Sequence, residues 1–151
     1  MKAILIIIAA FVAIISAIIY LNKPQITPQA PTPTPFSEEK VNIKATFTII
    51  TGNITRSFKA EKYHNLSPDV YIEASDPNIV HVTKTGITWN DFFKTLPMKL
   101  SKDCLVTGDG ENLCSDKGSL KFYLNDVEDK DLLDKEIRDD DKALIIYTYA
   151  V

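Results

Sequence analysis

The chain of 151 residues is poor in the residue types on which many active sites depend, with only two cysteines, two histidines and five glycines. It contains no phosphate-binding glycine loop, no dinucleotide fingerprint and no Gly-x-Ser-x-Gly nucleophile elbow. It also lacks a basic patch, and its formal net charge of −3 argues against nucleic acid as a partner. We therefore expect no cofactor, no nucleic-acid partner and no catalytic activity, apart from the redox or metal chemistry that the cysteines and a histidine allow.

Charge is absent from the run between Ala3 and Leu21, whose nineteen residues hold one aliphatic hydroxyl, that of Ser16. A helix of this length rises roughly 30 Å at about 1.5 Å per residue, which matches the hydrocarbon core of a bilayer. The run is longer than the apolar part of a cleaved secretory signal, and residues 20–24 offer no Ala-x-Ala-like cleavage site. The sequence therefore predicts that residues 3–21 contact the lipid bilayer as an uncleaved anchor, with a cleaved signal as the alternative.

Positive charge gives little help with the orientation of this anchor, because Lys2 lies on one side of it and Lys23 on the other. The Asn-x-Ser/Thr sequons at Asn53 and Asn65 are usable as glycosylation sites only outside the cytoplasm. A disulfide would likewise need an oxidising compartment. We therefore expect a cell-membrane protein with a cytoplasmic N-terminus and an external C-terminal domain.

Proline is concentrated after the anchor, where five of the eight prolines occupy positions 24, 28, 31, 33 and 35. Proline fixes φ and removes backbone donors, so this segment favours extended polyproline II over a packed core. We divide the chain into a transmembrane anchor (residues 1–22), a proline-rich linker (residues 23–37) and an extracytoplasmic domain (residues 38–151). The domain holds all twenty acidic residues and carries a formal charge of about −5.

Alternation of apolar and polar residues recurs through the domain and is typical of half-buried strands. The predicted strands are residues 41–49, 54–60, 70–74, 79–84, 100–107, 112–115, 120–124 and 143–149. The last of them, ALIIYTY, is apolar on both faces and is typical of a central strand. The pattern predicts an α+β domain, mostly antiparallel sheet with one short packed helix.

The helix is indicated by Thr88 as N-cap and Asp91 as the residue that answers it in a capping box. Its apolar face consists of Trp89, Phe92, Phe93 and Leu96. Pro97 limits its continuation. We expect this aromatic face to cover the sheet, which makes Trp89 a core residue rather than a platform for a ligand.

The order hairpin, helix, strands, acidic segment and buried final strand resembles that of β-grasp (ubiquitin-like) domains. The residues that carry the resemblance are Lys121 to Asp126, Leu132, Leu133, Ile137 and Asp140 to Tyr147. The resemblance covers about residues 70–149 and implies a β-grasp-like fold to which the first hairpin is an N-terminal addition. Sulfur carriers and ubiquitin-like modifiers end in Gly-Gly, whereas this sequence ends in Tyr149-Ala150-Val151, so conjugation chemistry is not implied.

A second resemblance involves residues 80–86, Asp91-Phe92-Phe93 and the segment from Cys104 to Cys114. These stretches are similar to a little-characterised group of prokaryotic membrane-anchored proteins, some of which carry the name disulfide isomerase. Proteins of this group often have His-x-His on the strand before the helix. Here His81 stands at the first position of that motif and Thr83 at the second.

Cys104 and Cys114 are separated by nine residues, with Gly-Asp-Gly at positions 108–110 midway between them. A turn there would bring the cysteines together across a hairpin, so we expect a structural disulfide, which stabilises by roughly 2–3 kcal/mol in the chain-entropy description. Redox catalysts of the thioredoxin type instead place Cys-x-x-Cys at a helix start. A redox-active pair and two free buried thiols are the alternatives.

The histidines and cysteines match no compact zinc motif, so we assign no metal site and keep His81 only as a candidate ligand for copper or zinc. Nine acidic residues lie between Asp126 and Asp141. An EF-hand loop starting at Asp126 would need glycine in place of Asp131 and glutamate in place of Ile137. We interpret the acidic tract of Asp126, Glu128, Asp129 and Asp131 as a solvated turn.

These observations predict a single-pass, membrane-anchored module that binds an envelope partner or has a structural role, without catalysis. The alternative is a thiol-exchange or metal-handling envelope protein that uses Cys104, Cys114 and His81. The first hypothesis expects a buried, inert disulfide, and the second expects an accessible, reducible pair.

Overall fold

The computed structural model of the protein describes residues 40–150. The predicted anchor (residues 1–22) and the predicted linker (residues 23–37) lie outside the described residues, so both stay predictions. None of the helices in the part that the structure describes is long and apolar enough to cross a membrane.

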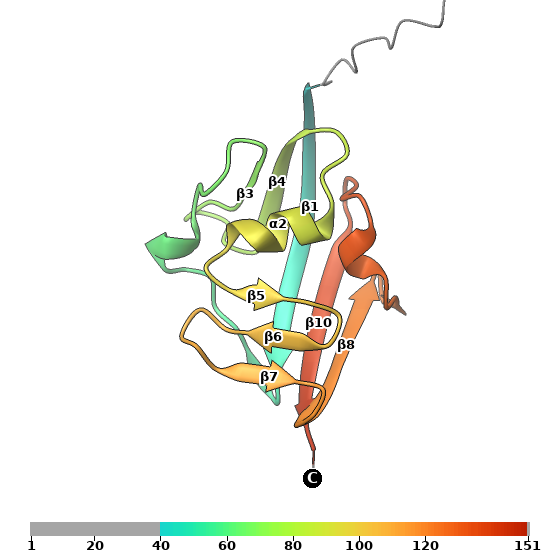
Figure 1. Ribbon diagram of the computed structural model, residues 1–151. Coiled ribbons are helices and arrows are strands. Elements are labelled where there is room, and N and C mark those ends of the chain that lie inside the picture. The colour runs from blue at the N-terminus through green and yellow to red at the C-terminus, as the bar shows by residue number, and fades with distance from the viewer. Residues whose placement is uncertain (1–39, 151) are drawn as a thin grey trace, which may run out of the picture. The chain divides into compact units, whose positions relative to one another are not determined.

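Strands dominate residues 40–150 (Figure 1). In chain order the elements are β1 (Lys40–Thr51), β2 (Ile54–Thr55), η1 (Glu61–Tyr63), β3 (Val70–Tyr71), β4 (Ile79–Lys84), α2 (Trp89–Thr95), β5 (Lys99–Leu100), β6 (Cys104–Val106), β7 (Asn112–Cys114), β8 (Gly118–Leu124), β9 (Val127–Glu128), η2 (Leu132–Asp134) and β10 (Lys142–Tyr149). The elements η1 and η2 are single 3₁₀ turns. The coarse prediction, a mixed α/β domain that is mostly sheet with one α-helix, is confirmed for this range.

The main sheet has the strand order β3-β4-β1-β10-β8-β9, and β2 pairs with the end of β1. The two central strands, β1 and β10, run parallel, while β4 and β8 flank them in antiparallel pairings. Our expectation that the first hairpin is an addition to the fold is therefore wrong for β1, which lies at the centre of the sheet. β1 is part of the core sheet because its inward-facing residues Ala45, Phe47 and Ile49 are all buried.

The inner faces of the central strands meet in register, with Phe47 opposite Ala143 and Ile49 opposite Ile145. All four side chains are buried, as alternation along a half-buried strand requires. The other face of β10 differs from the prediction, because Leu144 and Ile146 are only half-buried. The last strand is thus central in the sheet, as predicted, but only one of its faces belongs to the core.

The helix α2 begins at the predicted cap. The backbone N–H of Asp91 donates to the Thr88 hydroxyl (3.2 Å), and the backbone N–H of Thr88 donates to the Asp91 carboxylate (3.0 Å). This reciprocal pair satisfies two of the N–H groups that a helix N-terminus leaves without partners. The helix ends at Thr95, directly before Leu96 and Pro97.

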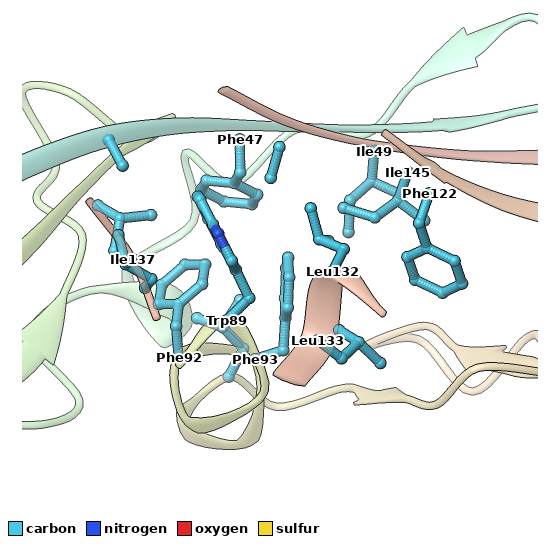
Figure 2. Packing of buried hydrophobic residues seen from close by; sticks show 14 of the residues in the cluster. Phe47, Ile49, Trp89, Phe92, Phe93, Phe122, Leu132, Leu133, Ile137 and Ile145 are labelled. Atoms are coloured by element: carbon cyan, nitrogen blue, oxygen red, sulfur yellow. The ribbon is translucent and has the colours of Figure 1, made fainter. Parts of the chain in front are cut away.

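The aromatic face of α2 packs on the inner face of the sheet (Figure 2). The ring centroids of Phe92 and Phe93 lie 5.0 and 5.9 Å from that of Phe47, both in edge-on arrangements that aromatic pairs favour. Trp89 is 0% exposed, which confirms its predicted place in the core. Leu132 of η2 belongs to the same cluster and lies beside the aromatic residues of α2 in Figure 2.

The acidic segment is more than a solvated turn. Leu132, Leu133 and Ile137 are buried, and the Asp141 side chain is also buried. Its carboxylate accepts from the Asn125 side-chain amide (2.9 Å) and from the Arg138 backbone N–H (3.0 Å). Asp141 therefore fixes the approach to β10. The solvated turn was predicted for the acidic tract that precedes these buried residues, where Asp126, Glu128 and Asp131 are exposed and Asp129 is half-buried.

Three predicted strands are shorter than expected, and the one predicted at residues 70–74 covers only Val70–Tyr71 (β3). The return strand predicted at residues 54–60 pairs with β1 only over Ile54–Thr55, after which Phe58 turns into the core. The strand predicted at residues 100–107 is divided into β5 and β6, because the backbone N–H of Ser101 donates to the Cys104 carbonyl (2.8 Å) and closes a turn. Together β5, β6 and β7 form a separate three-stranded sheet.

Candidate functional site

Cys104 and Cys114 lie directly opposite each other on β6 and β7, with their Cα atoms 4.0 Å apart and their sulfurs joined. The turn predicted between them is present, because the Gly110 backbone N–H donates to the Thr107 carbonyl (2.9 Å). The pairing within one hairpin follows the prediction. The burial does not, because both cysteines are only half-buried.

The disulfide-bonded hairpin is attached to the main sheet at the end that carries the disulfide, opposite its turn. The Tyr147 hydroxyl donates to the Cys114 carbonyl (3.2 Å), and Tyr147 itself is fully buried. Leu105 and Leu113, which pair across the hairpin, are also buried. The bridge therefore closes a hairpin that is part of the packed structure, not a free loop.

A pocket of about 300 Å³ lies beside this hairpin. It is lined by residues of β1, of the segment from β2 to η1, of the link between α2 and β5, and of the hairpin: Ile49, Arg56, Ser57, Phe58, Ala60, Lys62, Tyr63, Met98, Leu105, Thr107, Gly108 and Asp109. Its volume falls at the lower end of the range of about 300–1,000 Å³ found for small-molecule sites.

The floor of the pocket is apolar. Ile49, Phe58 and Leu105 come from three different segments and are each at most 3% exposed, so they are held by the core itself. Met98 adds a flexible thioether side chain that packs against the core cluster. This floor suits an apolar group, and its shape is fixed by residues that cannot move without disturbing the core.

The mouth of the pocket is charged. The Arg56 guanidinium pairs with the Glu111 carboxylate, lies 3.8 Å from the Asp109 carboxylate, and donates to the Thr51 hydroxyl (2.9 Å). Arg56 is thus locked between two acidic residues of the hairpin turn. The Tyr149 hydroxyl donates to the other oxygen of Glu111 (3.0 Å), which ties the same cluster to the end of β10.

Lys62 is the second cation at the mouth, and its environment differs from that of Arg56. Its ammonium group donates to the Gly108 carbonyl (3.3 Å) and lies 5.0 Å from the centre of the Tyr63 ring. Among residues 40–150 no carboxylate lies within ion-pairing distance of it. Lys62 is therefore the cation at this mouth that is free to meet an incoming group.

One carboxyl group and one phenol group at the mouth, those of Asp109 and Tyr149, have shifted pKa values. The hydrogen bond from the Thr107 hydroxyl, with smaller contributions from its own backbone and from Arg56 and Lys62, lowers the pKa of Asp109. The hydrogen bond to Glu111 raises the pKa of Tyr149. Asp109 therefore stays ionised over a wider pH range than a free carboxyl and keeps the mouth structure intact.

Tyr63 and Pro97 also pack closely around Gly108 at the mouth. A Cβ atom added at Gly108 would lie 2.6 Å from the Tyr63 hydroxyl and 3.0 Å from the Pro97 carbonyl. An added Cβ atom would therefore require the end of the Tyr63 side chain to move away and would crowd the Pro97 carbonyl.

The other candidate residues do not converge on a site. His81 stacks on Tyr71, with ring centroids 5.3 Å apart, and its Nε2 atom is buried without a hydrogen-bond partner. His64 is separate from it and contacts the Phe58 carbonyl through Nε2 (2.9 Å). No group of three or more metal-binding side chains occurs within residues 40–150.

Both sequons lie on exposed turns, as predicted. Asn53 is exposed in the β1–β2 turn, and Asn65 is exposed with a left-handed φ of 53° after η1. Asparagine tolerates this conformation better than most residues. Their surface positions would leave room for a modification, which itself stays a prediction.

Sequence reasoning did not find the pocket. Arg56 and Lys62 carry no recognisable motif, and their partners Glu111 and Gly108 are 55 and 46 residues away along the chain. The available signal was a pair of cations flanking Phe58, an apolar residue in a stretch that is otherwise polar. No protein-family model, curated protein or solved structure matches the chain.

Proposed function

We propose that this chain is a membrane-anchored binding module without catalytic activity, held to the bilayer by residues 3–21 and displayed outside the cytoplasm. The described domain would bind a ligand or envelope partner, and the Cys104–Cys114 disulfide would stabilise the binding site. The β-grasp resemblance is part of this proposal.

The observation that carries the proposal is the pocket beside the disulfide-bonded hairpin. The bridge fastens the hairpin whose residues Leu105, Thr107 and Asp109 line that pocket. Its lining contains neither histidine nor cysteine, Arg56 is ion-paired with Glu111 and lies beside Asp109, and Lys62 makes only a long contact with a backbone carbonyl. Such an arrangement can recognise a molecule but holds no evident nucleophile and base in contact.

The order of elements supports the β-grasp part of the proposal. An antiparallel pair, β1 with β4, comes first, α2 follows, and then come β8, the acidic segment and the central β10. The resemblance was based on residues 70–149, with the hairpin at residues 70–84 in first place, and the pair of β1 with β4 now takes that place. The first and last strands, β1 and β10, pair in parallel at the centre of the sheet.

A second candidate function is thiol exchange, and one observation favours it. Because Cys104 and Cys114 are half-buried, a reductant or partner thiol has a route to them that a buried bridge would deny. Against this function stands the location of both cysteines on paired strands, away from the helix start that lowers a thiol pKa in redox catalysts.

The test is the intact mass of the full chain extracted from membranes under thiol-blocking conditions, with and without reductant. The proposal expects residues 1–22 to be retained and two thiols to be labelled only after reduction. A domain accessible to a membrane-impermeant thiol reagent in intact, reductant-treated cells supports the external location. Labelling of both thiols without reductant, or disulfide-reductase turnover that is lost in Cys104→Ser, would contradict it.

A further inference from the structure

We propose that the pocket binds a small, mainly apolar molecule that carries one anionic group, which the Lys62 ammonium receives at the mouth. This inference rests on the proposed binding function and specifies its ligand. It follows from three features of the pocket: its floor, its charges and its size.

The floor sets the apolar part. Ile49, Phe58, Met98 and Leu105 present aliphatic, aromatic and thioether groups and no hydrogen-bonding side chain. A polar group placed there would lose its water without gaining a partner, which is unfavourable. An apolar group of the ligand would instead remove further apolar surface of the floor from water.

The charges set the head group. Arg56 and Glu111 neutralise each other directly, and Asp109 is engaged by Thr107 and Arg56. The Lys62 ammonium donates to the neutral Gly108 carbonyl at the long distance of 3.3 Å, lies against the Tyr63 ring and acts on the Asp109 charge without forming an ion pair with it. An anionic oxygen would replace the carbonyl contact with a stronger hydrogen bond in which both partners are charged. A cationic head group would face Lys62 and the already paired Arg56, which makes it unfavourable.

The size sets the upper limit. A pocket of about 300 Å³ has room for a single small molecule and not for a folded partner. Lys62, Tyr63 and Gly108 all line the pocket, and Lys62 donates to the Gly108 carbonyl across it. The ligand class is therefore a short aryl or alkyl carboxylate, or a molecule with the same combination of groups.

The chain offers a direct probe of this pocket. It has only two methionines, Met1 and Met98, and Met98 lines the floor. Full-length protein in lipid nanodiscs, labelled with ¹³C at the methionine methyl groups, would give one signal from the pocket and one from the chain start. A Met98→Leu variant assigns the two signals.

The experiment titrates phenylpropionate, phenylpropanol and phenylpropylamine, which share a phenylpropyl body and differ in the head group. We expect phenylpropionate to shift the Met98 signal and leave Met1 unchanged, with an affinity about three- to tenfold above that of the alcohol and higher still above that of the amine. Empty nanodiscs give the background from partition into lipid.

Two variants separate the head-group contact from the floor. Lys62→Gln is expected to remove the preference for phenylpropionate over phenylpropanol, whereas Lys59→Gln, a matched change at an exposed lysine outside the lining, should leave it. Ala60→Trp, which fills the pocket from an exposed lining position, should abolish binding of all three probes.

Equal binding of the three probes, or a preference for the amine, would overturn the anionic head group, and an unshifted Met98 signal would overturn the ligand class. None of these outcomes bears on the membrane anchor or the inert disulfide, which the thiol-labelling experiment tests by itself.

Discussion

Removal of the disulfide gives the most direct measure of what holds the pocket wall in place. We consider the double variant Cys104→Ser, Cys114→Ser. The two cysteines are ten residues apart along the chain. In the chain-entropy description, closing a loop of that length lowers the free energy of the folded state relative to the unfolded state by about 2.7 kcal/mol.

The variant should keep its native fold while losing that stability. Leu105 and Leu113 remain buried and the Tyr147 hydroxyl still holds the Cys114 carbonyl, now that of a serine, so the hairpin has other attachments. The half-buried positions tolerate the serine hydroxyls, because these can reach water. For a urea slope of about 1–3 kcal/mol/M, the unfolding midpoint should fall by roughly 1–3 M.

The assay is urea unfolding of the full chain in detergent, followed by the fluorescence of Trp89. This is the one tryptophan in the sequence, and it is fully buried in the core. Reductant added to the wild-type protein should reproduce the midpoint of the double variant, and the same reductant should leave the double variant unchanged. A loss below about 1 kcal/mol would refute the reasoning, because the bridge would then contribute less than its loop length requires.

Three further predictions follow from local contacts. Thr88→Val should cost about 1 kcal/mol of unfolding free energy by removing the two hydrogen bonds that the Thr88 hydroxyl makes with the Asp91 backbone N–H and carboxylate, while Thr88→Ser should keep the wild-type value, as measured by thermal melting. The Thr88 hydroxyl and backbone lower the pKa of Asp91, so its contribution is present above the ordinary carboxyl pKa of about 4 and is lost as the pH falls through the lower folded value. The stability difference between wild type and Asp91→Asn should therefore be largest near neutral pH and shrink in acid; a difference that grows in acid would contradict this sign. Gly108→Ala should destabilise by about 1–3 kcal/mol through its clash with the Tyr63 hydroxyl, and Tyr63→Phe in the same chain should restore part of the loss.

The parts of the fold that local signals encode were predictable from the sequence. The capping box needs only residues three positions apart, so Thr88 and Asp91 marked the start of α2 correctly. The alternation from Val41 to Ile49 likewise marked β1, and the glycines at 108 and 110 marked the turn between the cysteines. Each of these features is decided by a few neighbouring residues.

Pairings between distant segments were not predictable in this way. The parallel contact of β1 with β10 joins residues almost a hundred positions apart, and nothing in either strand specifies the other. As a result the first strand was assigned to an added hairpin instead of the centre of the sheet. The outer face of β10 shows the same limit, because its apolar residues indicated burial on both sides while the described residues cover only one.

The pocket depends on both kinds of information at once. Phe58 could be recognised as apolar and Gly108 as a turn residue, yet the site exists only because the chain folds the first segment against the second. On an exposed 3₁₀ turn Lys62 would be an ordinary surface lysine. Against the Gly108 carbonyl it becomes a cation that has no ion pair within residues 40–150 and lies at the mouth of a pocket with an apolar floor. A binding function that rests on such a placement leaves no motif in the sequence. Changing the charge of Lys62, or the head group of the ligand, therefore tests the proposed binding function more directly than a sequence motif could.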